Sequence, residues 1–172
     1  VLENHRRFAK ALEYDETRLV FSDQVHLTRF HKVTKKDCGK GIIRESDIKE
    51  IDGLVTNEPG IPIITFYADC VPLFFYDPVK KVIAMAHSGW RGTVGRIGAK
   101  MTAYMEEEYG STARDILCAV GPSICQKCYE VSEEVALQFL DVFGTAYGDE
   151  LLYEKEGGKY QLNLHKACEI TL

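Results

Sequence analysis

The chain has 172 residues, of which 45% are hydrophobic and 27% charged, a composition that predicts one globular domain with a core of its own. Its net charge is −5, and an acidic chain is not expected to bind nucleic acid. No apolar run approaches the roughly 18 residues of a membrane span, and no basic stretch followed by an apolar one opens the chain as a signal peptide would.

The ends and the cysteines indicate the kind of chain. Val1 stands where a starting Met would, and Leu172 lies inside an apolar helical pattern, so we expect a piece of a longer chain. Residues 1–172 show no repeat or linker and are expected to form a single domain. The six cysteines are Cys38, Cys70, Cys118, Cys125, Cys128 and Cys168. Without a secretory signal they predict reduced thiols in a cytoplasmic protein.

The first half of the chain alternates one helix with strands. Apolar residues at helical spacing predict a helix over 2–13. Loose alternation predicts a strand over 18–25, and the charged, Gly-containing segment 34–51 predicts a long loop. The β-branched and aromatic runs at 61–67 and 73–76, bounded by prolines, predict two strands.

The second half continues this pattern. The apolar run 81–86 predicts a strand covered on both faces, and 115–120 predicts a second buried strand. Helices are predicted over 93–109, ending at Gly110, and over 132–143. Interspersed helices and strands favour a layered α/β (α+β) protein in which helices flank a mixed β-sheet core.

Two of the five histidines, together with one cysteine, are candidate metal ligands. His5 and His165 lie on predicted helices and are expected to be structural. His26, Cys70 and His87 each fall at the end of a predicted strand, where loops gather into sites. Two imidazoles and one thiolate are a three-ligand set typical of catalytic zinc. A cysteine at such a place is also compatible with a small buried side chain.

The neighbours of these residues suggest further roles. Asp69 is interpreted either as a carboxylate that orients a ligating histidine or as the cap of a turn. Residues 87–93 lead through two glycines into a helix, so Arg91 and the helix start are candidate contacts for an anionic group. The alternative is a tight turn whose Trp90 packs in the core.

The remaining motifs point to less specific chemistry. Cys125 and Cys128 form a single C-x-x-C in a Gly-Pro loop, which favours structural or incidental thiols over a zinc ribbon or a thioredoxin-like site. The G-x-S-x-G of serine hydrolases is absent. A thiol hydrolase that uses Cys70 and His87 stays open as an alternative.

Five motifs in order resemble those of the YfiH-like, or laccase-domain, family. They are Gln24-Val25-His26, the segment Asp52–Thr56, Ala68-Asp69-Cys70-Val71-Pro72, the segment Ala86–Gly92, and the segment Gly121–Val131. The resemblance extends from Val1 to the last residues. Two positions depart from the family pattern: Leu27 stands where the family usually has Gly, and Ser88 where it usually has Ala. We also expect that this chain lacks the family's N-terminal lead-in and its further C-terminal segment.

This resemblance implies a YfiH-like fold and a zinc-dependent purine nucleoside phosphorylase, which also deaminates adenosine and cleaves methylthioadenosine. It implies that His26, Cys70 and His87 hold the metal and are catalytic, and that the partners are purine nucleosides and phosphate. Asp69 and Arg91 are the expected substrate contacts. The oligomeric state is left as monomer or homodimer, with no nucleic acid and no membrane as partners.

Two other functions remain as alternatives. The older name of the family implies a copper-dependent polyphenol oxidase, but five histidines are too few for a multicopper cluster. Copper could still occupy the same three ligands. The other alternative is a non-enzymatic module in which a metal with four protein ligands only holds strands together.

Overall fold

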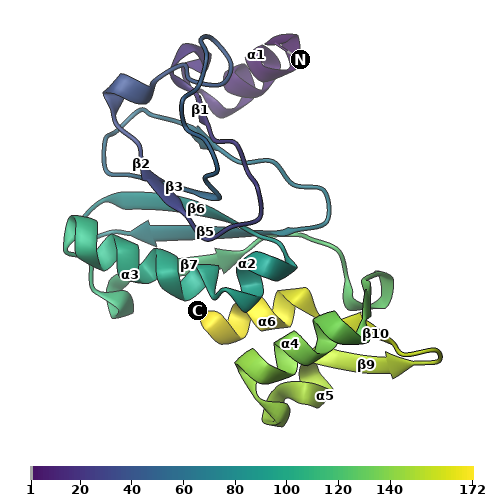
Figure 1. Ribbon diagram of the computed structural model, residues 1–172. Helices are drawn as coiled ribbons and strands as arrows, with labels where there is room; N and C mark the ends of the chain where they lie inside the picture. The colour runs from purple at the N-terminus through teal and green to yellow at the C-terminus, as the bar shows by residue number, and fades with distance from the viewer. Residues whose placement is uncertain (1) are drawn as a thin grey trace.

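The computed structural model describes residues 2–172 (Figure 1). Val1 lies outside the described residues, and the expectation of one domain over 1–172 stays a prediction. The helices are α1 (Leu2–Leu12), α2 (Trp90–Val94), α3 (Ile97–Tyr109), α4 (Glu133–Phe143), α5 (Gly148–Leu151) and α6 (Leu164–Thr171). The strands are β1 (Val20–Phe21), β2 (Phe30–Lys32), β3 (Gly53–Thr56), β4 (Ile63–Ile64), β5 (Val71–Asp77), β6 (Val82–Ser88), β7 (Leu117–Val120), β8 (Glu130–Ser132), β9 (Leu152–Lys155) and β10 (Lys159–Leu162).

A mixed five-stranded sheet in the order β2-β3-β6-β5-β7 forms the centre of the molecule. The β2–β3 pair is parallel and the other pairs are antiparallel. Helices α2, α3 and α6 lie along one face of this sheet (Figure 1). A separate antiparallel sheet, β8-β10-β9, packs with α4 beyond them. The expected layered α/β architecture with a mixed sheet and flanking helices is therefore confirmed.

The helix-covered face of the sheet forms the main core. Buried Leu73 and Phe75 of β5 alternate with exposed Phe74 and Tyr76 on the opposite face. Buried Met101 and Met105 of α3 and Leu164 of α6 belong to the same apolar cluster. Because one face of β5 packs on the core and the other faces solvent, its buried and exposed side chains alternate with a period of two residues.

Two strands that were expected to be buried on both faces, β6 and β7, have exposed side chains. Leu117 of β7 is 61% exposed because β7 is the last strand of the sheet and pairs only with β5. Ile83 of β6 is 41% exposed on the open face. By contrast, β3 is buried on both faces, since Val55 joins the main core and Leu54 a second one with Val20. An apolar run alone does not reveal which strand lies at an edge.

Other predicted elements are confirmed with shifted bounds. The helix predicted over 93–109 is two helices, α2 and α3, separated where Arg96 takes a left-handed φ of 55°. Gly110 does end α3 with a left-handed φ of 65°. The strands expected over 18–25 and 61–67 shrink to two residues each, β1 and β4, which pair in parallel. The long loop over 34–51 contains a 3₁₀ turn at Lys35–Asp37 and an isolated bridge between Lys40 and Arg44.

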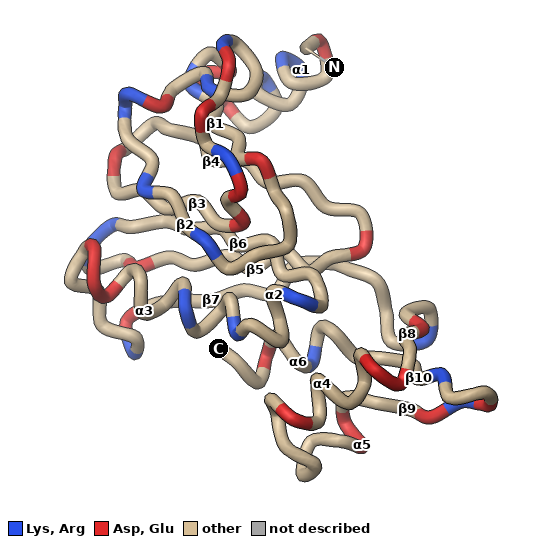
Figure 2. Tube along the Cα trace, viewed as in Figure 1, with Lys and Arg blue, Asp and Glu red and all other residues tan. Residues whose placement is uncertain are grey.

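Charged residues of both signs are scattered along the chain and are separated by longer uncharged stretches (Figure 2). Within residues 2–172, no helix has the length and apolar character needed to cross a bilayer.

Candidate metal centre

His87 enters the site from the end of a central strand. It is the next-to-last residue of β6, is only 4% exposed, and pairs across the sheet with Pro72 of β5. Its ring Nδ1 donates to a carboxylate oxygen of Asp52 over 2.8 Å, and its backbone N–H donates to the Asp52 carbonyl over 2.7 Å. This contact leaves Nε2 as the ring atom that is available to a ligand.

Asp52 is fully buried at the start of β3 and connects both histidines. Besides His87, its carboxylate accepts hydrogen bonds from the backbone N–H groups of Val25 (3.3 Å), His26 (2.9 Å) and Leu27 (2.8 Å). Burial alone would raise the pKa of this carboxyl, but the bonds from His87 and these amides lower it below its usual value. Asp52 is therefore an ionised anchor for the loop that carries His26.

His26 lies on that loop in an unusual backbone conformation. Its φ is 64°, in the left-handed region that non-glycine residues seldom adopt. The three amide bonds to Asp52 hold the loop in this conformation. The rings of His26 and His87 stand edge to face with their centroids 4.7 Å apart. Strain that is held by surrounding contacts is common at functional sites.

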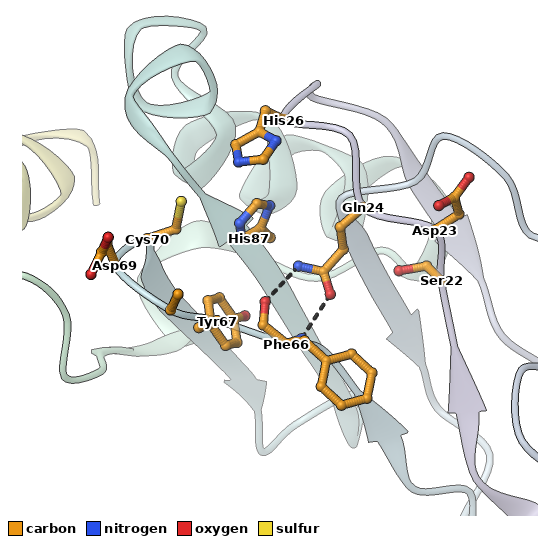
Figure 3. Close-up of a pocket in the computed structure, with 10 residues that line it drawn as sticks. Ser22, Asp23, Gln24, His26, Phe66, Tyr67, Asp69, Cys70 and His87 are labelled. Carbon is orange, nitrogen blue, oxygen red and sulfur yellow. Dashed lines mark hydrogen bonds between the residues drawn. The ribbon is translucent and has the colours of Figure 1, made fainter. Parts of the chain in front are cut away.

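Cys70 completes the group from the bend before β5, rather than from the end of the preceding strand as predicted. One ligand atom from each of His26, Cys70 and His87 lies within 4.8 Å of the others. Figure 3 shows the three side chains pointing toward one another. Burial would lower the pKa of His87, yet Asp52 and the Cys70 thiol raise it to about 9. The structure thus brings together the three residues that the sequence singled out.

The backbone around the three ligands leaves room for their convergence. A Cβ on Gly89, which follows β6, would lie 2.8 Å from Cδ2 of His26 and 3.0 Å from Sγ of Cys70. Any side chain at Gly89 would therefore push the two ligands apart. The donor set of two nitrogens and one sulfur, with no fourth His, Cys, Asp or Glu in the group among residues 2–172, fits a metal that keeps an open position.

The three ligands line an open cavity of about 510 Å³. Its other walls are Ser22, Asp23, Gln24, Phe66, Tyr67, Ala68 and Asp69. The Gln24 side chain donates to the Phe66 carbonyl (2.9 Å) and accepts from the Phe66 N–H (2.7 Å), which joins the two sides of the cavity (Figure 3). Phe66 is 53% exposed and presents its ring beside this opening.

Asp69 and Arg91 lie near the three ligands but do not orient them. The carboxylate of Asp69 lines the cavity and points away from the two histidines (Figure 3). The carboxylate bonded to His87 is Asp52, so the expected orienting role of Asp69 belongs to another residue. The exposed Arg91 guanidinium lies 4.3 Å from the centroid of the Trp90 ring, outside the cavity wall.

Sequence reasoning missed Asp52 as a functional residue. Asp-Gly is a common turn pair, so the residue types at Asp52-Gly53 do not by themselves indicate a role in the site. A signal for its role was available in the sequence: Asp52 comes directly before an apolar strand, and polar side chains at the end of a buried strand often belong to sites. Only the pairing of β3 with β6 places its carboxylate under His87.

Comparison with known proteins gives one consistent family. A family model described as multi-copper polyphenol oxidoreductase laccase matches residues 1–172. Purine nucleoside phosphorylase YlmD of Bacillus subtilis (strain 168) is 40% identical over 176 residues, which cover 100% of this chain and 62% of that protein. Adenosine deaminase RL5, from an unknown prokaryotic organism, is 38% identical over 176 residues, which cover 100% of this chain and 65% of that protein.

A solved structure shares the fold as well. The crystal structure of the Bacillus licheniformis hypothetical protein YfiH superposes with a TM-score of 0.93 at 34% identity, over 99% of this chain and 64% of that one. The chain therefore spans less than two thirds of the length of these relatives.

Proposed function

Because the chain belongs to the multi-copper polyphenol oxidoreductase laccase family, we propose that it acts as a purine nucleoside phosphorylase with a metal ion held by His26, Cys70 and His87. The observation that carries this proposal is the convergence of these three ligands beside an open cavity. The names of the relatives, most of them purine nucleoside phosphorylases, support the substrate class.

We propose zinc as the metal. Two imidazoles and a thiolate are ligands that zinc prefers, and three protein ligands leave one position for water or substrate. When bound, zinc supplies a Lewis acid that polarises an oxygen atom of the bound reactants. Asp52 keeps His87 in the orientation that exposes Nε2, and it keeps His26 on a loop of fixed shape.

In phosphorolysis a phosphate oxygen bonds to the anomeric carbon of the ribose while the bond from that carbon to the purine nitrogen breaks. The purine leaves with a proton, and ribose 1-phosphate remains. Phe66, fixed by Gln24 and half exposed at the opening, offers a ring on which the base can stack. We propose that Asp69, which lines the cavity, contacts the nucleoside. We propose that the Arg91 guanidinium attracts the phosphate anion to the site.

We extend the proposal to adenosine deamination and methylthioadenosine phosphorolysis at the same site. The similarity to the protein named adenosine deaminase RL5 supports the first activity. The second follows from the same bond cleavage on a nucleoside with a different 5′ group. We further propose a cytoplasmic enzyme that acts on small molecules, as a monomer or homodimer without nucleic acid; the six free cysteines support a reducing compartment.

The test is incubation of the purified protein with inosine, with and without phosphate, followed by chromatography of the products. We expect hypoxanthine and ribose 1-phosphate only when phosphate is present. Treatment with a chelator should abolish turnover, and added zinc should restore it. Hypoxanthine release that needs no phosphate and survives chelation would contradict the proposal.

Phenol oxidation by copper has less support. Within residues 2–172 the structure gathers one group of three ligand residues, which is a site for one ion. Metal analysis of protein prepared without added copper separates the two functions. Stoichiometric copper together with turnover of a phenol would favour the oxidase.

A further inference from the structure

Cys125 and Cys128 form an exposed pair of thiols that the proposed function does not use. Both are free, and they stand at the two ends of one 3₁₀ turn, η4 (Gln126–Cys128), for which Cys125 is the N-cap. The Cys128 N–H donates to the Cys125 carbonyl over 3.0 Å. Residues three apart in a 3₁₀ helix eclipse one another, at a rise of about 6 Å. That separation is within the Cα spacing of about 4.4–6.8 Å that a disulfide spans.

The pKa values of the two thiols shift in opposite directions. The Cys128 thiol and backbone N–H lower the pKa of Cys125, while the same contact raises the pKa of Cys128. A thiol with a lowered pKa is the attacking nucleophile in exchange with a disulfide, and its neighbour then resolves the mixed disulfide. Cys118, which is also exposed, has its pKa raised by the surrounding chain and has no such partner among residues 2–172.

The backbone connects this turn with the metal ligand Cys70. Just before the pair, the Ile124 N–H donates to the carbonyl of Asp69 over 3.1 Å, and Asp69 is the residue that precedes Cys70. Just after it, the N–H of Tyr129 donates to the Cys125 carbonyl over 3.1 Å. A change of shape in η4 therefore acts on Asp69, the residue that precedes the ligand.

We propose that Cys125 and Cys128 are a redox-active dithiol, that a low-molecular-weight disulfide oxidises them to an intramolecular disulfide, and that closure shifts the bend that carries Cys70. The thiolate of Cys125 attacks the added disulfide, forms a mixed disulfide and releases one thiolate. The Cys128 sulfur, losing its proton to solvent, then attacks Sγ of Cys125 and releases the second thiolate. Two protein thiols are oxidised while one external disulfide is reduced to two thiols. The effect on Cys70 rests on the proposed function.

The dithiol is tested by equilibrating the protein with reduced and oxidised glutathione in a series of ratios, alkylating the remaining thiols, and mapping peptides by mass spectrometry. We expect both residues to become resistant to alkylation together, at a single midpoint of the glutathione ratio. The oxidised peptide that contains them should be two hydrogen atoms lighter than the reduced, unalkylated peptide. Cys125→Ser and Cys128→Ser should each carry one glutathione adduct instead, and Cys118→Ser should behave as the wild type. Two residues that stay alkylatable in the oxidised series, or that carry separate adducts without closing, would overturn the proposal.

The link to Cys70 is tested by the zinc affinity of the reduced and oxidised protein, measured by competition with a chromophoric chelator. The loss of one backbone hydrogen bond corresponds to about a fivefold change in an equilibrium constant. We therefore expect zinc to bind the oxidised wild type about fivefold more weakly, and dithiothreitol to reverse the change. The Cys125→Ser/Cys128→Ser double variant should bind zinc equally in both buffers.

Equal affinities in the wild type, or the same loss in the double variant, would overturn the link. Neither measurement uses a nucleoside. A failure of the phosphorylase activity is therefore distinguishable from a failure of this inference.

Discussion

Asp52 accepts four hydrogen bonds in the interior, one from His87 and three from the amides of residues 25–27. It contributes no ligand atom, yet it sets the ring orientation of one histidine and the loop conformation of the other. Carboxylates that bond to a ligating histidine commonly affect metal affinity about 10–100-fold when they are changed.

We therefore expect Asp52→Asn to weaken zinc binding by about 10–100-fold while the chain still folds. The amide keeps the shape of the carboxylate, but its N–H₂ group faces donors and its charge is lost. Zinc affinity measured by chelator competition checks this. Asp69→Asn is the matched control, because its carboxylate lines the same cavity without contacting a histidine. Normal zinc affinity in Asp52→Asn together with weak zinc affinity in Asp69→Asn would contradict the prediction and would mean that Asp69 is the residue that supports the ligands.

The cysteines separate by position in the same way. Cys70→Ala should lose both metal and nucleoside turnover, because two remaining ligands do not hold zinc in an open site. Under reducing conditions Cys125→Ala and Cys128→Ala should keep the metal. Both thiols are exposed, so each variant should leave the free energy of unfolding close to that of the wild type. Metal analysis and denaturant titration of the three variants check this, and metal loss in Cys128→Ala alone would contradict the site.

At the scale of elements, the loop over 34–51 depends on one buried carboxylate. Asp37 accepts from the Thr34 N–H (2.8 Å) and from Lys40 Nζ (2.7 Å). Burial would raise the pKa of Asp37, but Lys40, Thr34 and the nearby His31 lower it to about 2. A carboxyl whose pKa falls on folding stabilises the folded state above its unfolded pKa, and this contribution is lost as the pH falls through the folded value.

Asp37→Asn should therefore destabilise the protein at pH 7 by about 2 kcal/mol. The difference from the wild type should shrink between about pH 4 and pH 2, as the wild-type carboxyl becomes protonated. Denaturant titrations across this range check the prediction. Asp47→Asn is the control, since its exposed carboxylate bonds to the same Lys40 and, screened by solvent, should contribute much less. A gap between wild type and Asp37→Asn that stays constant from pH 7 to pH 2 would refute the assignment.

At the scale of the whole molecule, helices cover one face of the five-stranded sheet, while the opposite face is covered over β3 by the second core and open over β5. Helices α3 and α6 cover the face to which Phe75 belongs, and the opposite face carries Phe74 at 40% exposure. The metal centre lies at one end of this sheet, where the ends of β6 and the starts of β3 and β5 meet. Folding of the sheet is thus a condition for the site.

Two consecutive phenylalanines on β5 measure this asymmetry. Phe75→Ala should cost about 3–5 kcal/mol of unfolding free energy, because it empties a filled core position. Phe74→Ala should cost about 1 kcal/mol or less, since its ring is half exposed on the open face. Equilibrium unfolding in urea, read by circular dichroism, gives both values. Equal losses would mean that the open face is covered in solution.

The elements that the sequence predicted well are those that local physics decides. Helix α4 begins at Glu133, one residue after the start of the helix predicted over 132–143, and the acidic residues of its first turn favour a helix N-terminus. Gly110 marked the end of α3 because only a residue without a Cβ adopts its conformation at little cost. The strands over 115–120 and 81–86 were placed correctly, but their burial was wrong, because burial depends on the neighbouring strand and helix layer.

The sequence by itself determined the chemistry that is present: a thiol and two imidazoles next to strand-forming runs, a net negative charge, and motifs that resemble one family. The tertiary structure decided which groups meet, because His26, Cys70 and His87 are separated by 44 and 17 residues and only strand pairing brings their ligand atoms within 4.8 Å. It also decided that Asp52, rather than Asp69, bonds to His87. A carboxylate's role depends on what lies beside it in space, so the acidic residue next to Cys70 in the sequence is not the one that bonds to His87.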